Sequence, residues 1–323
     1  MKSGNSDCHN FFIPITTANY RMKRSLMDEV GVLLLRQGYT IKSLTRTSFD
    51  IVARKDAHVL LIKVLEDANS ISEDYADSMK NLSSHIGASP IIIAEKAGNR
   101  LEDGVVYVRF GVYTCNYRTF SSCLENRFPI VISTRAGFTA SVIGEKLRQQ
   151  REENGYSLGS LSRKVGVSKR MIAKYESERA DVSLRSAIAL NRLFGNNIFN
   201  KVDVFAIAKE TVAGKPSMIA RKYDELGFRA ADTKKAPFDV VARMEKELIL
   251  TEVKGRHRIK DLNPQLESMQ QLLGADALVI LDKKEKSGNT EKNKKKLPSL
   301  DKKDFLGIES AQELIKFLRE FEE

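Results

Sequence analysis

The sequence predicts a multidomain protein in which two α/β domains, each built on a mixed sheet, flank a central all-α domain. Three observations support this prediction. One stretch of sequence recurs farther along the chain, β-branched runs alternate with helical patterns around each copy, and four short helical segments lie between the copies. At 323 residues, the chain is long enough for three domains of ordinary size.

The recurring stretch is QGYTIKSLTRTSFDIVARKDAHVLLIKV at 37–64, which is echoed by LGFRAADTKKAPFDVVARMEKELILTEV at 226–253. A constant offset of 189 residues aligns Asp50 with Asp239, and several neighbouring positions match without a gap. So many gapless matches are unlikely by chance and indicate an internal repeat.

Each copy shows the same order of predicted elements: a helix, two β-branched runs close enough for a hairpin, a helix, a buried strand, a second strand and a helix. The last four of these elements are expected at 75–86, 90–94, 105–108 and 119–125 in the first copy, and at 262–273, 277–281, 297–300 and 310–320 in the second. The order predicts a mixed sheet flanked by helices. The expected α/β domains span 21–129 and 201–323, after a flexible extension at 1–20.

The central domain is expected at 130–200. It opens with IVISTRAGFTASVIG at 130–144, which predicts a β-hairpin because Gly137 in its turn can adopt a positive φ. Four segments with helical periodicity follow. Ser157 precedes the second and Ser168 the third, where a hydroxyl can accept a hydrogen bond from an exposed backbone N–H.

Composition narrows the class of protein. The chain has 53 Lys and Arg residues against 42 Asp and Glu residues, and the resulting net charge of +11 favours a polyanionic partner. The apolar runs are far shorter than the ~18 residues of a membrane-spanning helix. The three cysteines form no C-x-x-C pair, which indicates neither a zinc site nor a disulfide framework and favours a cytoplasmic protein.

The segment LRQQREENGYSLGSLSRKVGVSKRMIAKYES at 147–177 resembles the helix-turn-helix of the Cro and C1 repressor family. With LEDGVVYVRFGV and RAGF before it, the whole arrangement is similar to a family of archaeal transcriptional regulators whose role is inferred. The resemblance implies binding to double-stranded DNA. A single helix-turn-helix covers one half-site, so a homodimer is expected.

The third helical segment, around 168–175, is the expected reading helix. Ile172 and Tyr175 are apolar positions that belong to the core, so the opposite face should project from the domain. That face carries Lys169, Arg170 and Lys174, with Ser168 at the helix N-terminus. Arg170 can contact guanine with two hydrogen bonds, and the two lysines can reach base edges or phosphates. The resemblance further implies that Ser157 touches the phosphate backbone and that Arg151 pairs with Glu176.

The second copy also contains Asp239, Glu252 and Lys254, which match the D…E-x-K pattern of restriction-endonuclease-like folds. Residues two apart on a strand share a face, so Glu252 and Lys254 should lie together, and two carboxylates can hold Mg²⁺. The aligned positions in the first copy are Asp50, Lys63 and Leu65, which predicts a degenerate site there.

The leading interpretation is therefore a sequence-specific DNA-binding transcriptional regulator without a cofactor and without enzymatic activity. The alternative is a Mg²⁺-dependent DNA nuclease that uses the second copy. The intact second-copy triad favours the nuclease, whereas the loss of the same triad from the first copy favours the regulator.

Overall fold

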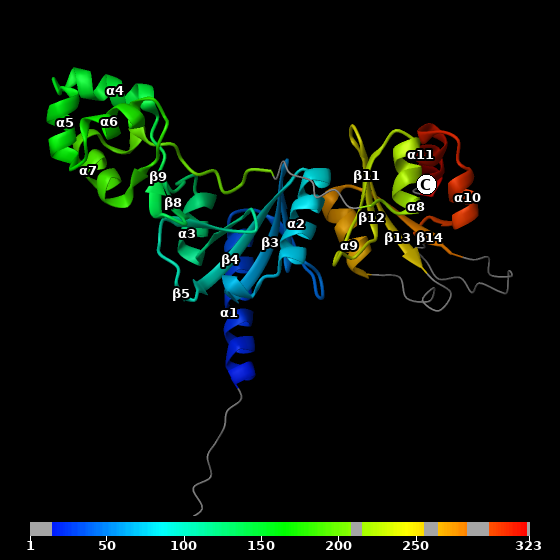
Figure 1. Ribbon diagram of the computed structural model, residues 1–323. Helices are drawn as coiled ribbons and strands as arrows, with labels where there is room; N and C mark the ends of the chain where they lie inside the picture. Colours follow the sequence, from blue (N-terminus) through cyan, green and yellow to red (C-terminus); the bar gives the residue numbers. More distant parts are fainter. Residues whose placement is uncertain (1–14, 208–214, 255–263, 283–296, 322–323) are drawn as a thin grey trace, which may run out of the picture.

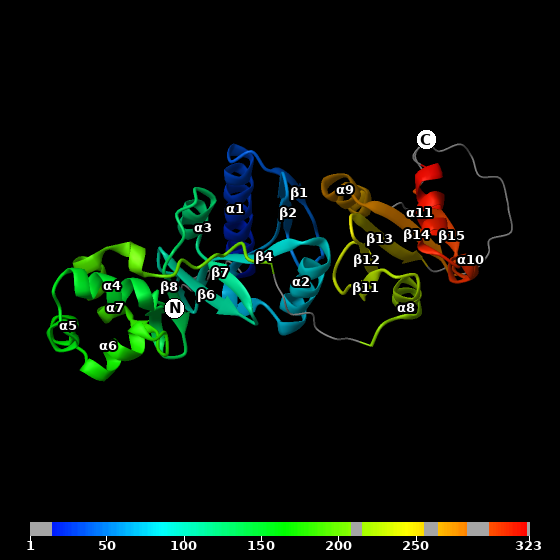
Figure 2. The same ribbon diagram turned by 90° about the horizontal axis from the view of Figure 1, so that it is seen from above.

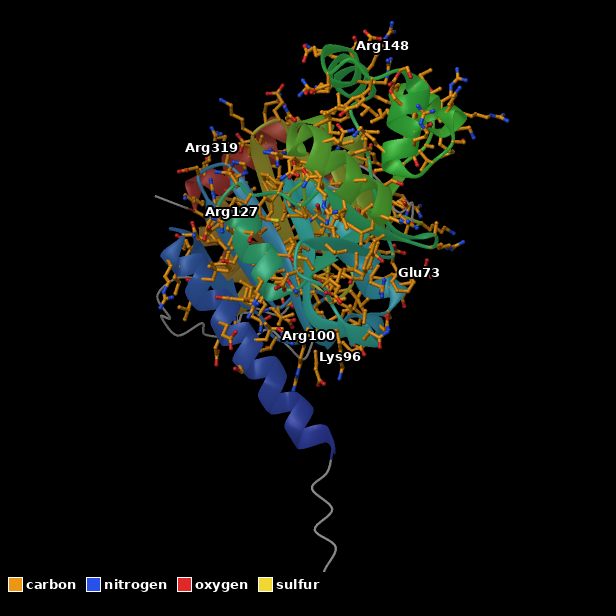
Figure 3. The ribbon with its side chains drawn as sticks, turned by 90° about the vertical axis from the view of Figure 1, so that its left-hand side faces the viewer. Glu73, Lys96, Arg100, Arg127, Arg148 and Arg319 are labelled. Carbon is orange, nitrogen blue, oxygen red and sulfur yellow. The ribbon has the colours of Figure 1, made fainter. Side chains whose placement is uncertain are left out.

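The structure is a computed structural model that describes residues 15–207, 215–254, 264–282 and 297–321. In Figure 1 the helical domain lies at one end of the molecule, the first α/β domain in the middle and the second α/β domain at the other end. Figure 3 views the molecule from the helical end, where Arg148 projects from that domain.

The first α/β domain is a mixed sheet between two helical layers. Its strands run in the order β1-β2-β3-β4-β7-β6, with antiparallel pairing from β1 to β3 and parallel pairing from β3 through β4 to β7. Helices α1 and α3 share one core with one sheet face, and α2 packs on the other face. The elements are α1 (Ile15–Arg36), β1 (Thr40–Ser43), β2 (Ile51–Lys55), β3 (His58–Asp67), a 3₁₀ turn η1 (Ala68–Ser70), α2 (Glu73–Ile86), β4 (Ala88–Ala97), β5 (Asn99–Arg100), β6 (Val105–Arg109), β7 (Val112–Cys115) and α3 (Tyr117–Leu124).

The second α/β domain has a five-stranded sheet in the order β11-β12-β13-β14-β15. Here too the first pairs are antiparallel and the later pairs parallel. The elements are α8 (Met218–Glu225), β11 (Arg229–Asp232), β12 (Val240–Met244), β13 (Glu247–Lys254), α9 (Pro264–Leu273), β14 (Asp276–Leu281), β15 (Ser299–Asp301), α10 (Lys302–Gly307) and α11 (Ala311–Glu320). The predicted fold class, two mixed-sheet α/β domains around a helical domain, is confirmed.

The predicted hairpin is formed by β8 (Val131–Thr134) and β9 (Gly137–Ala140), with a φ of 100° at Gly137 in the turn. Strand β8 also pairs in parallel with β6 of the first α/β domain, and β9 pairs with the short β10 (Val182–Ser183). The first sheet therefore continues into the helical domain and reaches ten strands within the described residues. This pairing attaches the helical domain to the first α/β domain.

Several details differ from the sequence-based expectation. Strands β1 and β11 each add a third antiparallel strand to the predicted hairpin of their domain. Neither strand alternates clearly between buried and exposed residues, so the sequence of neither shows the alternation of apolar and polar residues that predicts a strand. Helix α1 begins at Ile15 and includes the last residues of the expected extension, because no glycine or proline interrupts 15–30. The rest of the extension, 1–14, and the start of the expected helix at 262–273 lie outside the described residues.

The two α/β domains pack on each other through a reciprocal interface. Helix α2 lies against β11 and β12, whereas α9 lies against β1 and β2, so that both helices stand between the two sheets (Figure 2). One hydrophobic cluster contains residues of both domains. Arg54 Nη1 donates to the carbonyl of Leu272 at 3.0 Å, and Arg243 Nη1 donates to the carbonyl of His85 at 3.3 Å. Arg54 and Arg243 correspond under the 189-residue offset.

These two arginine contacts should stabilise the domain pair. We expect Arg54→Ala and Arg243→Ala each to lower the free energy of unfolding by about 1 kcal/mol, because each loses a hydrogen bond from a charged donor to the last turn of a helix. Denaturant unfolding of the full chain measures the effect, with Arg100→Ala on the exposed β5 as the matched control. Equal stability of all three variants would contradict a role for these contacts.

Candidate nucleic-acid interface

The helical domain is built from α4 (Gly144–Glu153), α5 (Leu158–Val165), α6 (Lys169–Glu176) and α7 (Leu184–Phe194), followed by a 3₁₀ turn η2 (Asn196–Ile198). Each of these four helices contributes at least one buried apolar side chain to a common core. These helices are too short to be stable alone in water, so the core and the caps at their ends hold them. The central members of the core are Leu147, Leu161, Ile172 and Leu190.

The connection between α5 and α6 is a three-residue turn, 166–168. Gly166 ends α5 in the left-handed conformation, with a φ of 77°, and its N–H donates to the carbonyl of Ser162 at 2.9 Å. Ser168 then begins α6, and its hydroxyl accepts a hydrogen bond from Met171 N at 3.2 Å. The turn and the two caps fix the angle at which α6 leaves α5.

Ser157 caps α5 in the same way and accepts a hydrogen bond from Ser160 N at 3.0 Å. The side chain of Lys169 crosses the first turn of α5. A Cβ added to Gly159 would lie only 2.7 Å from Cε of Lys169. The structure thus brings Lys169 beside the N-terminus of α5, where backbone N–H groups and the helix dipole favour anions.

The face of α6 agrees with the sequence pattern in most respects. Ile172 and Tyr175 are buried in the core, and Lys169 and Arg170 are exposed. Lys174 is half-buried, so it is less available than its two neighbours. None of the three cations forms an ion pair within the described part of the chain. Their charge is therefore not neutralised by a carboxylate of the described chain.

Behind α6, Arg151 of α4 forms a two-bond ion pair with Glu176. Arg151 Nε donates to Oε1 at 2.5 Å, and Nη2 donates to Oε2 at 3.2 Å. The side chains are only 11% and 10% exposed. Arg151 also donates to the carbonyl of Tyr156 at 3.1 Å, and the Glu176 hydrogen bond raises the arginine pKa above its ordinary value. The pair joins the first helix of the domain to the last turn of α6.

Three further residues were not identified by sequence reasoning. Gly144 begins α4 so close to α6 that an added Cβ would lie 2.2 Å from the backbone oxygen of Glu176. Its N–H donates to Oε1 of Glu178 at 2.8 Å. Gly159 is the third, because it leaves room for Lys169. No local sequence signal distinguished these residues, because each contact depends on how another element packs.

In the second α/β domain, Glu252 and Lys254 of the D…E-x-K pattern lie at the end of β13, and Asp239 lies just before β12, which pairs with β13. Asp239 Oδ2 accepts a hydrogen bond from Val253 N at 2.7 Å, and Lys254 Nζ lies 3.5 Å from Glu252 Oε2. Because both carboxylates and the lysine are kept, the donor set is compatible with Mg²⁺. Among the described residues, no group of three or more His, Cys, Asp or Glu side chains is placed to hold a metal ion.

The first α/β domain has a different arrangement at the equivalent place. Asp50 Oδ2 accepts from Val64 N at 2.9 Å, which repeats the contact made by Asp239. The other oxygen of Asp50 pairs with Lys63 Nζ at 3.1 Å, and Lys63 is buried. An ammonium group therefore stands where the second domain has a carboxylate. The donor set of the first domain does not fit a divalent cation.

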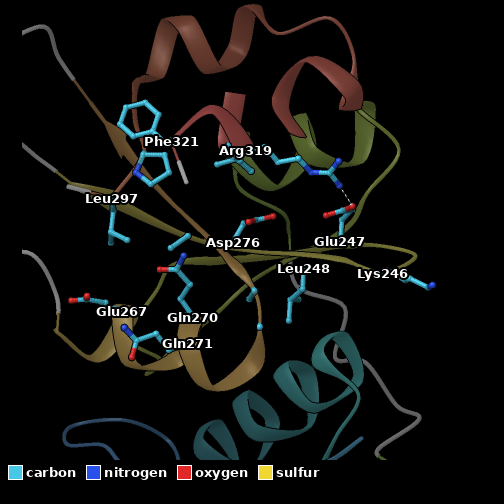
Figure 4. A pocket seen from close by; sticks show the side chains of 15 residues that line it. Lys246, Glu247, Leu248, Glu267, Gln270, Gln271, Asp276, Leu297, Arg319 and Phe321 are labelled. Atoms are coloured by element: carbon cyan, nitrogen blue, oxygen red, sulfur yellow. Dashed lines mark hydrogen bonds and ion pairs between the residues drawn. The ribbon is translucent and has the colours of Figure 1, made fainter. Parts of the chain in front are cut away.

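A cavity of about 630 Å³ opens elsewhere in the second α/β domain (Figure 4). It lies at the start of β13 and β14, between α9 and α11, and Arg319 donates to Glu247 at 2.8 Å on its rim. Glu247 begins β13 and Lys254 ends it, so the cavity and the D…E-x-K residues lie at opposite ends of this strand, roughly 20 Å apart. The cavity is thus separate from the nuclease-like site.

None of the helices in the described ranges combines the length and the apolar character that crossing a bilayer requires.

Comparisons with known proteins match two parts of this architecture. A PD-(D/E)XK superfamily domain matches residues 23–129, and a helix-turn-helix domain matches residues 147–198. The first match covers the domain that contains Asp50 and Lys63, so the nuclease-like fold is present in a domain that lacks the complete motif. No solved structure matches the chain.

Relatives match over nearly the whole length. A protein of Archaeoglobus fulgidus is 32% identical over 93% of this chain and 98% of its own length. Proteins of Methanocaldococcus jannaschii and Pyrococcus horikoshii are 30% and 31% identical over 92% of this chain and 97% and 98% of their own lengths. All three are named as HTH-type transcriptional regulatory proteins by inference. The chain belongs to this archaeal family.

Proposed function

We propose that the chain is a sequence-specific, DNA-binding transcriptional regulator that reads the major groove with α6. The observation that best supports this proposal is the exposed face of α6, where Lys169 and Arg170 have no carboxylate partner among the described residues. The helix-turn-helix match and the inferred regulatory role in the relatives' names support the same function.

The geometry suggests a role for each exposed group. Arg170 can form two hydrogen bonds to the O6 and N7 atoms of guanine, which is a base-specific contact. Lys169 lies beside the N-terminus of α5, where the Ser157 hydroxyl and the backbone N–H groups of the first turn suit a phosphate. Ser168 offers a second helix N-terminus. Lys174 is half-buried and suits a phosphate contact better than a base contact.

The α/β domains are proposed to support this reading module rather than to cut DNA. In the first, Lys63 pairs with Asp50 and leaves no two-carboxylate site. In the second, Glu252 and Lys254 on β13 and Asp239 just before β12 are retained, and this observation favours nuclease activity as the second candidate function. A regulator must leave its operator uncut, so we assign the first function.

Substitutions on α6 test its proposed role. Arg170→Ala should cost roughly 1 to 3 kcal/mol of binding free energy and relax the preference at one base position, whereas Lys174→Ala should weaken all sequences alike. Binding to a panel of duplexes with single-base changes measures both effects. Lys303→Ala, an exposed lysine of α10, removes the same charge as a control. If Arg170→Ala behaves like the control, α6 is not the reading helix.

The second prediction concerns assembly. One helix-turn-helix covers a single half-site, so we propose a homodimer whose two reading helices lie about 34 Å apart on a roughly palindromic operator. Sedimentation of the full chain with and without bound DNA measures the mass. A monomer under both conditions would argue against this assembly.

The third prediction concerns cleavage. Purified protein should leave duplex and branched DNA intact with Mg²⁺ or Mn²⁺, and Asp239→Ala should keep its affinity for DNA. Cleavage that requires a divalent metal and disappears in both Asp239→Ala and Glu252→Ala would overturn the assignment in favour of the nuclease, because each substitution removes one carboxylate. Cleavage that survives both substitutions indicates a contaminant.

A further inference from the structure

A basic groove lies on the helical domain, between the C-terminal end of α5 and α7. It is an open groove with a volume of about 550 Å³. Its cations are Arg163 and Lys164 on α5 and Arg185 and Arg192 on α7. No Asp or Glu lines the groove, and none of these four side chains forms an ion pair within the described ranges.

The groove also has an apolar side chain among its cations. Ile188 is 45% exposed, although β-branched apolar residues are ordinarily buried. Arg185, Ile188 and Arg192 are spaced three and four residues apart, so they share one face of α7. Along this face, the apolar side chain therefore lies between two positively charged side chains.

The groove is distinct from the proposed DNA-reading face. The proposed reading face uses the N-terminal end of α5, where Lys169 lies beside Gly159, whereas Arg163, Lys164 and Gly166 lie at the other end of that helix. With a rise of 1.5 Å per residue, the two ends of α5 are about 10–12 Å apart. Phosphate groups, which the cations would bind in nucleic acid, offer no apolar surface to Ile188.

We propose that this groove binds an acidic, amphipathic segment of a partner protein. Carboxylates of the segment pair with the four cations, and an apolar side chain of the segment covers Ile188. The exposed apolar residue is the reason to choose a protein segment over nucleic acid, since charge alone would serve either. The contact links the regulator to a second protein while α6 stays free, and it does not rest on the proposed reading of DNA.

A direct test uses the full chain and two fluorescent peptides of about 12 residues with identical composition. One peptide has Asp and Glu on one helical face and Leu on the other, and the second has the same residues shuffled to remove the apolar face. We expect the amphipathic peptide to bind at least about tenfold more tightly than the shuffled one. Equal binding of both peptides would reduce the groove to a non-specific basic surface and overturn the proposal.

Two variants locate the binding. The double substitution Arg185→Glu and Arg192→Glu should weaken the amphipathic peptide at least about tenfold, while Arg100→Glu with Lys303→Glu makes the same charge change elsewhere as the control. Ile188→Ser keeps every charge and should remove most of the difference between the two peptides. It also serves as the test if the double variant does not fold. Unchanged discrimination in Ile188→Ser would contradict the proposal.

DNA binding by the same variants separates the two classes of partner. The Arg185→Glu and Arg192→Glu variant should bind DNA within about twofold of its charge-matched control, because no residue of α6 lines the groove. If DNA affinity falls as much as peptide affinity does, the groove is part of the nucleic-acid surface, and the proposed protein partner is wrong.

Discussion

The ion pair between Arg151 and Glu176 is the interaction on which the geometry of the helix-turn-helix depends. Helix α6 has only eight residues and cannot hold its own orientation, so its last turn is tied to α4 by two hydrogen bonds. The pair is nearly buried, and burying two charges is stabilising only if their remaining hydrogen-bonding groups have partners. Arg151 meets this condition because it also donates to the carbonyl of Tyr156 and to Glu152. Gly144 allows the close approach of α4, because any Cβ there would collide with the backbone of Glu176. Together these contacts set the direction in which Lys169 and Arg170 point.

The pairing of the two α/β domains explains how one chain combines two related sites with different chemistry. Each domain places a helix against the other's outer strands, and Arg54 and Arg243 occupy corresponding positions in the two halves of the interface. In a dimer of identical subunits, one substitution alters both sites. In two domains of one chain, a substitution alters only one of the two sites. The first domain has Lys63 where the second has Glu252, and both keep the aspartate that accepts a hydrogen bond from β3 or β13. Strand β8 then attaches the helical domain to the domain with the altered site.

The sequence predicted what depends on local patterns. The mixed-sheet domains followed from β-branched runs, and the start of α6 followed from Ser168, whose hydroxyl accepts a hydrogen bond from a nearby backbone N–H. Contacts between distant segments could not be read in this way. The parallel pairing of β6 with β8, the approach of Gly144 to Glu176 and the partial burial of Lys174 each depend on where another element packs. The groove beside Ile188 also depends on the packing of α7 against α5, since neither helix alone has an unusual sequence.

The central claim is that α6 reads a defined DNA sequence and that the α/β pair leaves this DNA intact. Selection of bound molecules from a random duplex library, in the presence of Mg²⁺, tests both parts at once. The account predicts one recurring, roughly palindromic motif in uncut duplexes, with an affinity at least about 10³-fold above that for unrelated duplexes. A bound pool without a recurring motif, or one recovered as cleaved ends, would contradict it.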